Sequence, residues 1–283
     1  MSAAAPTDEP AAERFVHTER RGEVAIITIE RAAKLNALSS TVMSQLSREL
    51  TDVERDDDIK VVVLTGGPSS FSVGYDITEE VESGLARTED WHRQLSSNVA
   101  LTMQVWSLSK PVIGAVAGWC LAGGCELAMA CDILIAADDA HFGEPEIRFG
   151  SGPVTLLMPF VLGQKRTNEL LFTGDVMDAQ AAERAGLVNR VVPADQLLAA
   201  AEQLARKIAL TPLPVLRLTK QALTRAYEAM GLRVAVNANL DVAAVLNAAE
   251  SKERAEFGQL VATEGLRSAL AWRDERYAPY DLP

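Results

Sequence analysis

The chain alternates between short, almost continuously apolar runs and longer stretches that carry only an apolar stripe. The apolar runs are rich in Val and Ile, and they are Glu23–Glu30, Lys60–Gly66, Pro111–Gly118, Cys131–Ala137 and Leu187–Val192. Continuous runs of this kind are typical of strands that are covered on both faces of a sheet. The pattern therefore predicts buried strands throughout the part of the chain before residue 195.

The stretches between these runs have helical periodicity. Ser39 can act as the N-cap of a helix over Ser40–Glu54, in which Val42, Leu46 and Leu50 fall on one face. Further helices are predicted over Thr88–Leu108, Lys165–Phe172 and Asp178–Ala185. Because strands and helices alternate, we expect right-handed βα units and a largely parallel sheet, which is an α/β fold.

The pattern changes after residue 195, where no further strand is predicted. Four stretches have helical periodicity instead, and they are residues 195–210, 214–230, 232–250 and 254–276. The segment Thr211–Pro214 interrupts them, because proline ends helices. Helices with an apolar stripe and little core of their own should pack on the rest of the chain or on another subunit.

These patterns divide the chain into three parts. Residues 1–14 are expected to be a short disordered tail, residues 15–195 a β/α core, and residues 196–283 an α-helical C-terminal region that mediates oligomerisation. The N-terminus lacks the basic and apolar segments of a secretory signal, and no apolar run reaches the ~18 residues that span a bilayer. The expectation is a cytoplasmic protein without a membrane partner.

The overall charge and the cysteines exclude several functions. A formal net charge of -12 disfavours nucleic acid as a partner, since sequence-independent binding needs a basic face, although a local basic cluster can still hold a small anion. The cysteines are Cys120, Cys125 and Cys131, all in one apolar segment. Their odd number and their spacing fit neither a disulfide framework nor a zinc site. We interpret them as small core residues and expect no metal.

The segment GWCLAGGCELAMACD, residues 118–132, combines features that are costly in a helix. Gly123 and Gly124 are adjacent at its start, and Glu126 lies in its first turn within an apolar environment. A tight turn with an acid that complements the helix dipole would explain them. The alternative is an anion-binding backbone N–H beside a catalytic acid.

Three polar or glycine-containing segments each follow a strand. They are Ser69–Ile77, Ala122–Asp132 and Ala140–Gly150. Since sites in parallel α/β folds form outside the carboxyl ends of the strands, we expect these segments to lie near one another.

At these segments the chain resembles the crotonase family, the enoyl-CoA hydratase/isomerase superfamily. The matching stretches are RAAKLNALS, KVVVLTG, FSVGYDI, KPVIGAVAGWCLAGGCELAMACDILIAADDAHFGEPEI, LLFTGDVMDAQAAERAGLVNRVVP and TEGLRSALAWRDERYAPY, which cover almost all of the chain from about Phe15. The resemblance implies a crotonase-like ββα spiral core with an α-helical C-terminal region. It also implies a homotrimer or a dimer of trimers.

The resemblance implies an answer to the question raised by the glycine pair. Family members bind acyl-CoA thioesters and stabilise the enolate of the thioester with two backbone N–H groups, which correspond here to Gly123 and Tyr75. A helix-opening N–H without a neighbouring Cβ suits this task. Glu126 and Glu146 match the family's hydratase pair, in which Glu146 would handle the Cα proton and Glu126 would hold or activate water.

The function implied is hydration of a 2-enoyl-CoA to a 3-hydroxyacyl-CoA. Isomerases of the family typically need only the acid that matches Glu146, so the presence of both acids favours a hydratase. A double-bond isomerase or another enolate reaction on a specialised acyl-CoA stays open. A non-catalytic acyl-CoA-binding subunit is the alternative from a different class, with Glu126 a helix N-terminal acid and Glu146 a turn residue.

The resemblance also implies residues that contact the substrate. Lys34 is the best candidate for binding CoA phosphate, and the remaining candidates surround the same loops: Ala37, Ser72, Val73, Gly74, Asp76, Ile77, Ala122 and Gly124. The sequence contains neither a P-loop nor a dinucleotide glycine motif, so no cofactor is expected beyond the coenzyme A of the substrate.

The sequence departs from the family pattern at two places. Tyr75 stands where hydratases often have alanine, and its ring could line the acyl pocket or its hydroxyl could bond a polar acyl group. Arg148, in the unusual stretch RFGSGP, could pair with Glu146 and lower its pKa or lie at the surface. Glu144 is interpreted as a loop acid or a group that shapes the substrate site, and His92 as an exposed helix residue.

Overall fold

The computed structural model describes residues 13–280, and most of its core lies around a six-stranded sheet. Along the sheet the strands are ordered β1 (Val16–Arg21), β2 (Val24–Ile29), β3 (Val61–Thr65), β5 (Val112–Val116), β7 (Ile133–Ala137) and β10 (Arg190–Val192). All neighbours after β2 run parallel, and only β1 pairs antiparallel with β2. The predicted parallel sheet is confirmed, with β1 as a strand that the sequence pattern did not reveal.

A second, four-stranded sheet carries the loops that the sequence analysis singled out. Its strands are ordered β4 (Ser70–Ser72), β6 (Trp119–Leu121), β8 (His141–Gly143) and β9 (Val176–Asp178). Each has only three residues, which is too short for a periodicity signal. Because β4, β6 and β8 are parallel neighbours, the segments that follow them meet at one edge.

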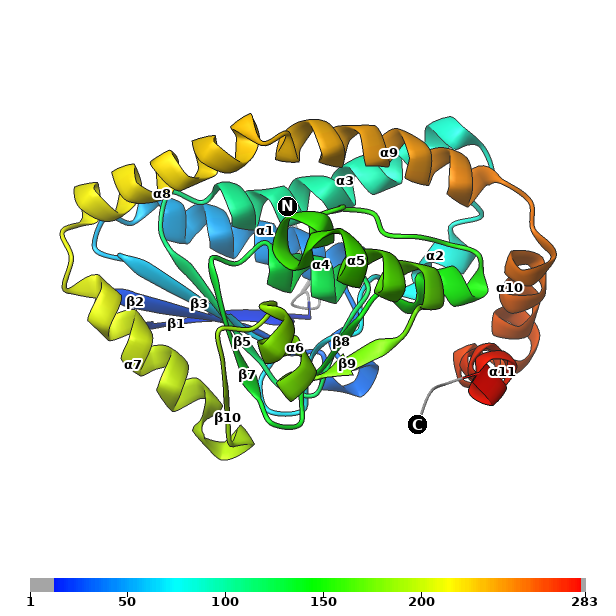
Figure 1. The fold of residues 1–283 in the computed structure, drawn as a ribbon, viewed down its shortest axis with the longest axis horizontal. Coiled ribbons are helices and arrows are strands. Elements are labelled where there is room, and N and C mark those ends of the chain that lie inside the picture. The colour runs from blue at the N-terminus through cyan, green and yellow to red at the C-terminus, as the bar shows by residue number, and fades with distance from the viewer. Residues whose placement is uncertain (1–12, 281–283) are drawn as a thin grey trace, which may run out of the picture.

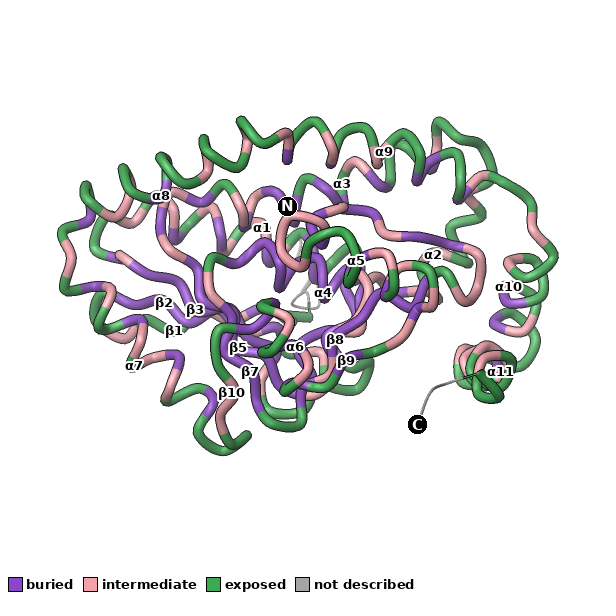
Figure 2. The backbone as a smooth tube through the Cα atoms, viewed as in Figure 1, coloured by how far each residue is buried: buried purple, intermediate pink, exposed green. Residues whose placement is uncertain are grey.

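Helices cover both faces of the large sheet. Side chains such as Ala25 and Ile27 point toward α1 (Ser40–Arg55) and belong to the larger core cluster, whereas Val24 and Ile26 pack against α7 (Leu197–Ala209). This alternation is the period of two that a strand imposes. The α7 helix follows residue 196 in the chain yet packs on β2, β3, β5 and β7. The exposed lower side of α7 and the buried strands can be followed in Figure 2.

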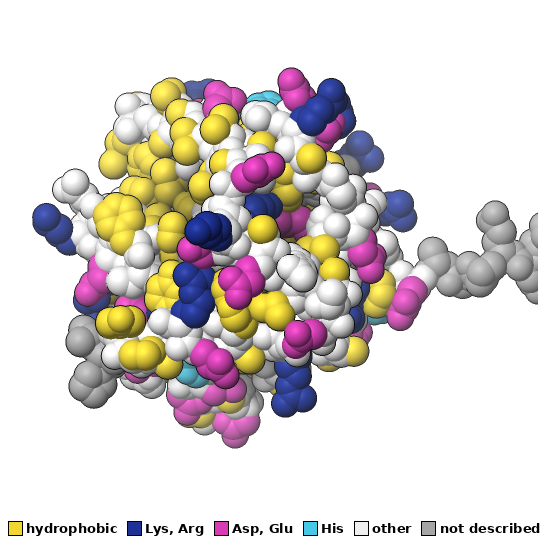
Figure 3. All heavy atoms as spheres, turned by 90° about the vertical axis from the view of Figure 1, so that its right-hand side faces the viewer, with side chains coloured by type: hydrophobic (Ala, Val, Ile, Leu, Met, Phe, Trp, Pro, Cys, Tyr) yellow, Lys and Arg dark blue, Asp and Glu magenta, His cyan; other side chains and the backbone are white. Residues whose placement is uncertain are grey.

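The remaining C-terminal helices lie along one side and one end of the molecule. The long α8 (Leu213–Ala229) and α9 (Leu232–Ala248) run across the top of Figure 1, with α9 against α3 (Thr88–Ser107), and α10 (Lys252–Glu264) and α11 (Leu266–Tyr277) lie at the right-hand end. Seen from that end, apolar atoms are interspersed with side chains of both charges (Figure 3). The stretch 254–276 was predicted as one helix, but Gly265, with φ of 88°, divides it into two.

The other helices support the loops between the strands. They are α2 (Ile77–Glu82), α4 (Gly123–Met129), α5 (Met158–Thr173) and α6 (Ala179–Ala185). Ser39 caps α1 through its side-chain oxygen, as the sequence predicts. Asp178, predicted as the first residue of a helix over Asp178–Ala185, instead caps α6 in the same way. The helix predicted over Lys165–Phe172 begins earlier, at Met158, and is kinked at Gly163, where φ is 70°. Gly163 interrupts the helical pattern of the sequence, so the pattern predicted this helix only from Lys165.

Among residues 13–280, no single helix is both long and apolar enough to cross a membrane. One bent pair, Leu213–Ala229 with Leu232–Ala248, meets the length and composition test together, with 57° between its two halves. The predicted disordered tail over 1–14 falls, except for its last two residues, outside the described residues.

Asn36 links the loop before α1 to the loop after β3 and to the start of β4 by hydrogen bonds. Its buried side chain donates to the carbonyls of Gly66 and Ser70 and accepts from the N–H of Arg31, and its φ is 57°. We expect Asn36→Ala to lower the free energy of unfolding by roughly 2–3 kcal/mol, because two buried carbonyls lose their donor. Denaturant unfolding measures this loss.

Asn36→Gly is the matched comparison, since glycine tolerates a positive φ but also lacks the amide. If both variants are destabilised equally, the hydrogen bonds account for the effect. If Asn36→Gly unfolds at the wild-type midpoint, the hydrogen bonds contribute nothing and the argument is wrong.

Candidate active site

One cavity of about 570 Å³ opens where the ends of β4, β6 and β8 meet. Glu146, Tyr75 and Ala122 line it, together with Lys34 and residues of α11 such as Arg273. The three loops that were predicted to converge therefore do so, and they do so around a single hollow. A cavity of this size with few polar groups is typical of a small-molecule site.

The glycine pair at the start of α4 is required because other parts of the same chain lie too close to leave room for a Cβ. A Cβ on Gly124 would lie 2.4 Å from the carbonyl oxygen of Ser72, and a Cβ on Gly123 would lie 2.5 Å from Cε2 of Tyr75. Ala122, which precedes them, takes a φ of 54°. A sharp turn thus brings the N-terminus of α4 directly beneath the Tyr75 ring.

Glu126 is completely buried in the first turn of α4. Its Oε1 accepts hydrogen bonds from the backbone N–H groups of Val154, at 2.5 Å, and Thr155, at 2.6 Å. Its Oε2 accepts from the Tyr75 hydroxyl at 3.4 Å. Burial raises the pKa of this carboxyl and the backbone N–H groups oppose the rise. Two fixed donors on one oxygen hold the carboxyl in a defined orientation.

Glu146 lies on the short 3₁₀ helix Pro145–Phe149 and faces the cavity. Its side chain is nearly buried, and its Oε2 has no hydrogen-bond partner among the described residues. Burial, reinforced by the charge of Glu126, raises the pKa of Glu146 to about 8. A carboxyl with this pKa holds a proton at neutral pH and can release it to a bound molecule.

Glu144 is a third buried carboxyl close to this pair. Only 2% of the residue is exposed, and its Oε2 has no hydrogen-bond partner in the described part of the chain. Burial first, and then the charges of Glu126 and Glu146, raise its pKa well above the usual value. Glu144 does not line the cavity, and it interacts with Glu126 and Glu146 through charge.

Tyr75 joins the cavity wall to Glu126. Its half-buried ring covers Gly123, and its hydroxyl donates to Glu126. Burial and the neighbouring carboxylate raise the pKa of this phenol well above 10, while Thr102 on α3 opposes the rise. Tyr75 thus lines the cavity, which fits one of the two arrangements that the sequence left open.

Arg148 does not have one of the two arrangements that the sequence left open, a pairing with Glu146. Its guanidinium forms an ion pair with Asp175 at 2.5 Å and donates to the carbonyl of Thr173. Its plane lies over the ring of Tyr277, with the centroid at 4.6 Å. The pKa of Glu146 is raised, not lowered as a pairing with Arg148 would require. Arg148 thus ties the loop after Glu146 to the start of β9 and to α11.

The other predicted contact residues divide into two groups. The first lines the cavity and comprises Lys34, Ala37, Val73, Asp76, Ile77 and Ala122. The second lies behind the wall and comprises Ser72, Gly74 and Gly124, together with Gly123 and Glu126. Ser72 accepts from the N–H of Gly74 and donates to a backbone carbonyl, and Asp76 caps α2 and pairs with Arg31 at 2.6 Å. Both are structural in this arrangement.

The cysteines and histidines have structural positions. All three cysteines are buried and unpaired, as expected of core residues. The exposed His92 of α3 forms a 3.2 Å pair with Asp241 of α9, and His141 contacts the carbonyl of Asp139. Over residues 13–280, no cluster of three or more His, Cys, Asp or Glu side chains could hold a metal ion.

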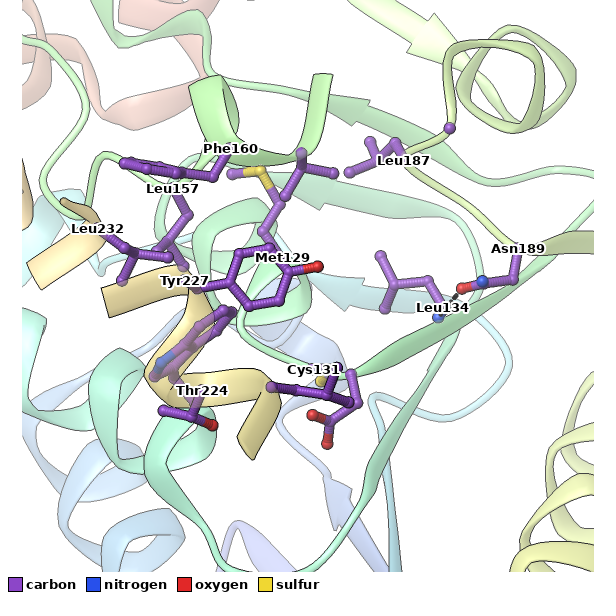
Figure 4. Close-up of a pocket in the computed structure, with 15 residues that line it drawn as sticks. Met129, Cys131, Leu134, Leu157, Phe160, Leu187, Asn189, Thr224, Tyr227 and Leu232 are labelled. Carbon is purple, nitrogen blue, oxygen red and sulfur yellow. Dashed lines mark hydrogen bonds between the residues drawn. The ribbon is translucent and has the colours of Figure 1, made fainter. Parts of the chain in front are cut away.

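A second cavity, of about 300 Å³, lies between α4, α5 and α8 (Figure 4). Met129, Leu157 and Tyr227 point into it, and Asn189 at its edge accepts a 2.8 Å hydrogen bond from the N–H of Leu134. The carboxyls of Glu126, Glu144 and Glu146 do not line it. Its wall carries no acid–base pair and so offers no comparable chemistry.

The sequence analysis singled out the stretch RFGSGP but missed the contact of the loop Ser151–Thr155 with Glu126 and the helix residues behind the loop. The N–H groups of this loop bind Glu126, and the side-chain amide of Asn239 on α9 donates to the carbonyls of Pro153 and Val154. No local signal could reveal backbone donors whose acceptor lies some 30 residues away. Asn239 belongs to a helix that the sequence pattern assigned only to packing.

The sequence is similar to known proteins over most of its length. A family model described as enoyl-CoA hydratase/isomerase matches residues 19–260. The chain is 41% identical over 215 residues to "Probable enoyl-CoA hydratase" of Mycobacterium bovis, covering 74% of this chain and 81% of the relative. It is 34% identical over 256 residues to the short-chain-enoyl-CoA hydratase of Clostridium acetobutylicum, covering 89% and 91%.

A solved structure extends the comparison to three dimensions. The crystal structure of an enoyl-CoA hydratase/isomerase from Xanthobacter autotrophicus Py2 superposes with a TM-score of 0.91 at 37% identity, covering 93% of this chain and 98% of that chain. The predicted fold class, an α/β crotonase-like spiral with a helical C-terminal region, is confirmed.

Proposed function

Since the chain belongs to the enoyl-CoA hydratase/isomerase family, we propose that it catalyses the addition of water across the 2,3 double bond of an enoyl-CoA thioester. The observation that carries the proposal is a pair of buried carboxyls with opposite hydrogen-bonding environments, Glu146 at the cavity wall and Glu126 behind that wall against Tyr75. Glu126 is held by backbone donors that favour its ionised form. Glu146 has an oxygen without a hydrogen-bond partner among the described residues and a raised pKa, which favours its protonated form.

In the proposed reaction the thioester carbonyl lies against the N-terminus of α4. The backbone N–H groups of Gly123 and Tyr75 would form the oxyanion hole for the enolate oxygen. A helix N-terminus favours developing negative charge, and one preorganised donor of this kind contributes about 3–4 kcal/mol of barrier lowering. The close approach of Gly124 to Ser72 supports this proposal, because it fixes the turn that presents the donors.

The two glutamates would divide the proton transfers between them. Ionised Glu126 accepts a proton from water while the water oxygen bonds to C3 of the substrate. Protonated Glu146 delivers its proton to C2, so the elements of water are added and no redox partner is needed. After one turnover the single proton of the pair has changed residue, and proton exchange between the two carboxyls through solvent restores the starting state.

The proposal predicts a specific pH dependence. Activity requires that the pair holds one proton in both directions, so hydration and dehydration must vary with pH together. Since the pKa of Glu146 is about 8, we expect kcat/KM for both directions to fall about tenfold per pH unit above pH 8. Initial rates from pH 6 to 10 in both directions provide the measurement, and a rate that rises through pH 8 would contradict the assignment.

The test of the proposal is turnover of a panel of short, medium and branched trans-2-enoyl-CoA thioesters. Loss of the conjugated thioester chromophore with a product heavier by one water identifies the hydratase. An isomer of unchanged mass would identify an isomerase, which the named relatives do not favour. Acyl-CoA binding without any turnover would identify a binding subunit.

Three parts of the sequence interpretation extend this proposal. Lys34, at the cavity wall, would contact CoA phosphate, and the reaction needs no cofactor beyond the coenzyme A of the substrate.

We also propose that the chain forms the trimer or pair of trimers implied by its family. Large apolar side chains exposed on α8 and α9, such as Leu218, Val234 and Val242, support self-association. A cytoplasmic location stays a prediction.

A further inference from the structure

Glu126 does not itself face the cavity in which the substrate is proposed to bind. The residue is completely buried and does not line the cavity wall. Its Oε1 already accepts hydrogen bonds from the backbone N–H groups of Val154 and Thr155. Water that reacts inside the cavity therefore needs a further group to pass its proton to this carboxyl.

Tyr75 connects Glu126 to the cavity. Its hydroxyl donates to Glu126 Oε2 at 3.4 Å, and the residue itself lines the cavity. The Thr155 hydroxyl also lies near the Glu126 carboxyl, but Thr155 is completely buried and does not line the cavity. Among the described residues, Tyr75 thus supplies the hydroxyl that can contact both Glu126 and a molecule in the cavity.

The same hydroxyl lies close to the atoms of the proposed reaction. Cζ of Tyr75, the ring carbon that carries it, would lie 2.7 Å from a Cβ on Gly123. The N–H of Gly123 is one of the two donors proposed for the thioester oxygen, and C3 of an enoyl-CoA is only two bonds away from the thioester carbonyl carbon. A water molecule that attacks C3 would therefore lie beside the phenol oxygen.

The environment of the phenol suits a group that gains one proton as it loses another. Burial, followed by the charge of Glu126, raises the pKa of Tyr75, so the phenol is neutral and a phenolate would be costly. A phenol oxygen donates one hydrogen bond and can also accept. It can therefore keep its hydrogen bond to Glu126 while it accepts one from water.

We propose that the Tyr75 hydroxyl relays the proton of the attacking water to Glu126. As the water oxygen bonds to C3, one water O–H bond breaks and its proton passes to the phenol oxygen, while the phenol proton passes to Glu126 Oε2. The electrons of the double bond move into the enolate, whose C2 then takes a proton from Glu146. Tyr75 ends neutral, so no further reactant is needed. The inference rests on the proposed function and adds a catalytic residue to it.

Tyr75→Phe removes only the hydroxyl and keeps both the ring and the backbone N–H of residue 75. We expect kcat for hydration of trans-2-hexenoyl-CoA to fall by roughly 10²–10⁴-fold, the usual contribution of a positioned acid–base group. Tyr227→Phe, which loses a hydroxyl at the second cavity, is the matched control and should hydrate at the wild-type rate. Wild-type hydration by Tyr75→Phe overturns the inference and leaves the proposed function standing.

Exchange of the C2 protons of saturated hexanoyl-CoA in D₂O separates a relay from a structural role. This exchange needs Glu146 and the oxyanion donors but no attack by water. Tyr75→Phe should therefore exchange these protons at close to the wild-type rate although its hydration is lost, and mass spectrometry follows both reactions. Equal losses of exchange and hydration would mean that the hydroxyl only positions the site, and would overturn the relay.

Tyr75→Ala distinguishes a relay from packing of the ring. Without the ring, water can occupy the place of the hydroxyl and contact Glu126 directly, so this variant should hydrate at least about tenfold faster than Tyr75→Phe. Hydration no faster than that of Tyr75→Phe overturns the inference. If Tyr75→Phe does not fold, Tyr75→Leu tests the same loss of the hydroxyl. A wild-type protein that exchanges the C2 protons but hydrates no thioester overturns the proposed function and the relay together.

Discussion

Replacing Glu146 by Gln is expected to lower kcat for hydration by roughly 10²–10⁴-fold, the usual contribution of a positioned general acid. The amide has nearly the shape of the protonated carboxyl but has no proton to deliver to C2. Because the Glu146 Oε2 has no partner among the described residues, the substitution breaks no hydrogen bond there. Substrate binding should change little, so the loss should appear in kcat and only weakly in KM.

Glu144→Gln is the matched control for this variant. Glu144 lies two residues away and is also buried with a raised pKa, but it does not line the cavity. Its replacement should leave kcat within a few-fold of wild type. Comparable losses in the two variants would mean that burying an amide in this loop disrupts the site, and would contradict the role of Glu146 as the proton donor.

Glu126→Gln is expected to lower kcat by a similar factor of roughly 10²–10⁴, for the complementary reason. The glutamine oxygen can still accept from the N–H groups of Val154 and Thr155, and its amide can donate to the Tyr75 oxygen. The side chain therefore keeps its position but can no longer take a proton from water. Steady-state hydration rates, with the thermal unfolding midpoint of the same sample, measure both parts of this expectation.

Glu126→Leu is the comparison variant for a loss of stability rather than of proton transfer. Leucine removes the acceptor of two buried N–H groups, so this variant should unfold at a lower temperature, whereas Glu126→Gln should unfold close to wild type. If Glu126→Gln keeps near wild-type hydration, water is not activated by Glu126 and its role is contradicted. A shifted double bond that survives Glu126→Gln but not Glu146→Gln would identify an isomerase.

The fold and the reacting residues follow from the sequence to different degrees. Long Val-rich runs and the helix capped by Ser39 predict the large sheet and its cover, because a period of two or 3.6 persists over many residues. The three-residue strands β4, β6, β8 and β9 have no such signal, and β1 is a half-exposed edge strand. Their pairing depends on contacts between distant segments.

The candidate site shows the same division. The glycines, Tyr75 and both glutamates stand in short motifs and could be found from the sequence. The N–H donors of Val154 and Thr155 and the side chain of Asn239 could not, since they join Glu126 and one another only in the folded chain. The raised pKa of Glu146 has the same origin, because burial by surrounding elements is its largest cause.

The most direct test of the central claim is the fate of isotopically labelled water. The protein is incubated with trans-2-hexenoyl-CoA in H₂¹⁸O, and the mass of the thioester product is followed for the wild type and the two glutamine variants. We expect a 3-hydroxyacyl-CoA that carries one ¹⁸O with the wild type, and almost none with Glu126→Gln or Glu146→Gln. A product without ¹⁸O, or full labelling by either variant, would contradict it.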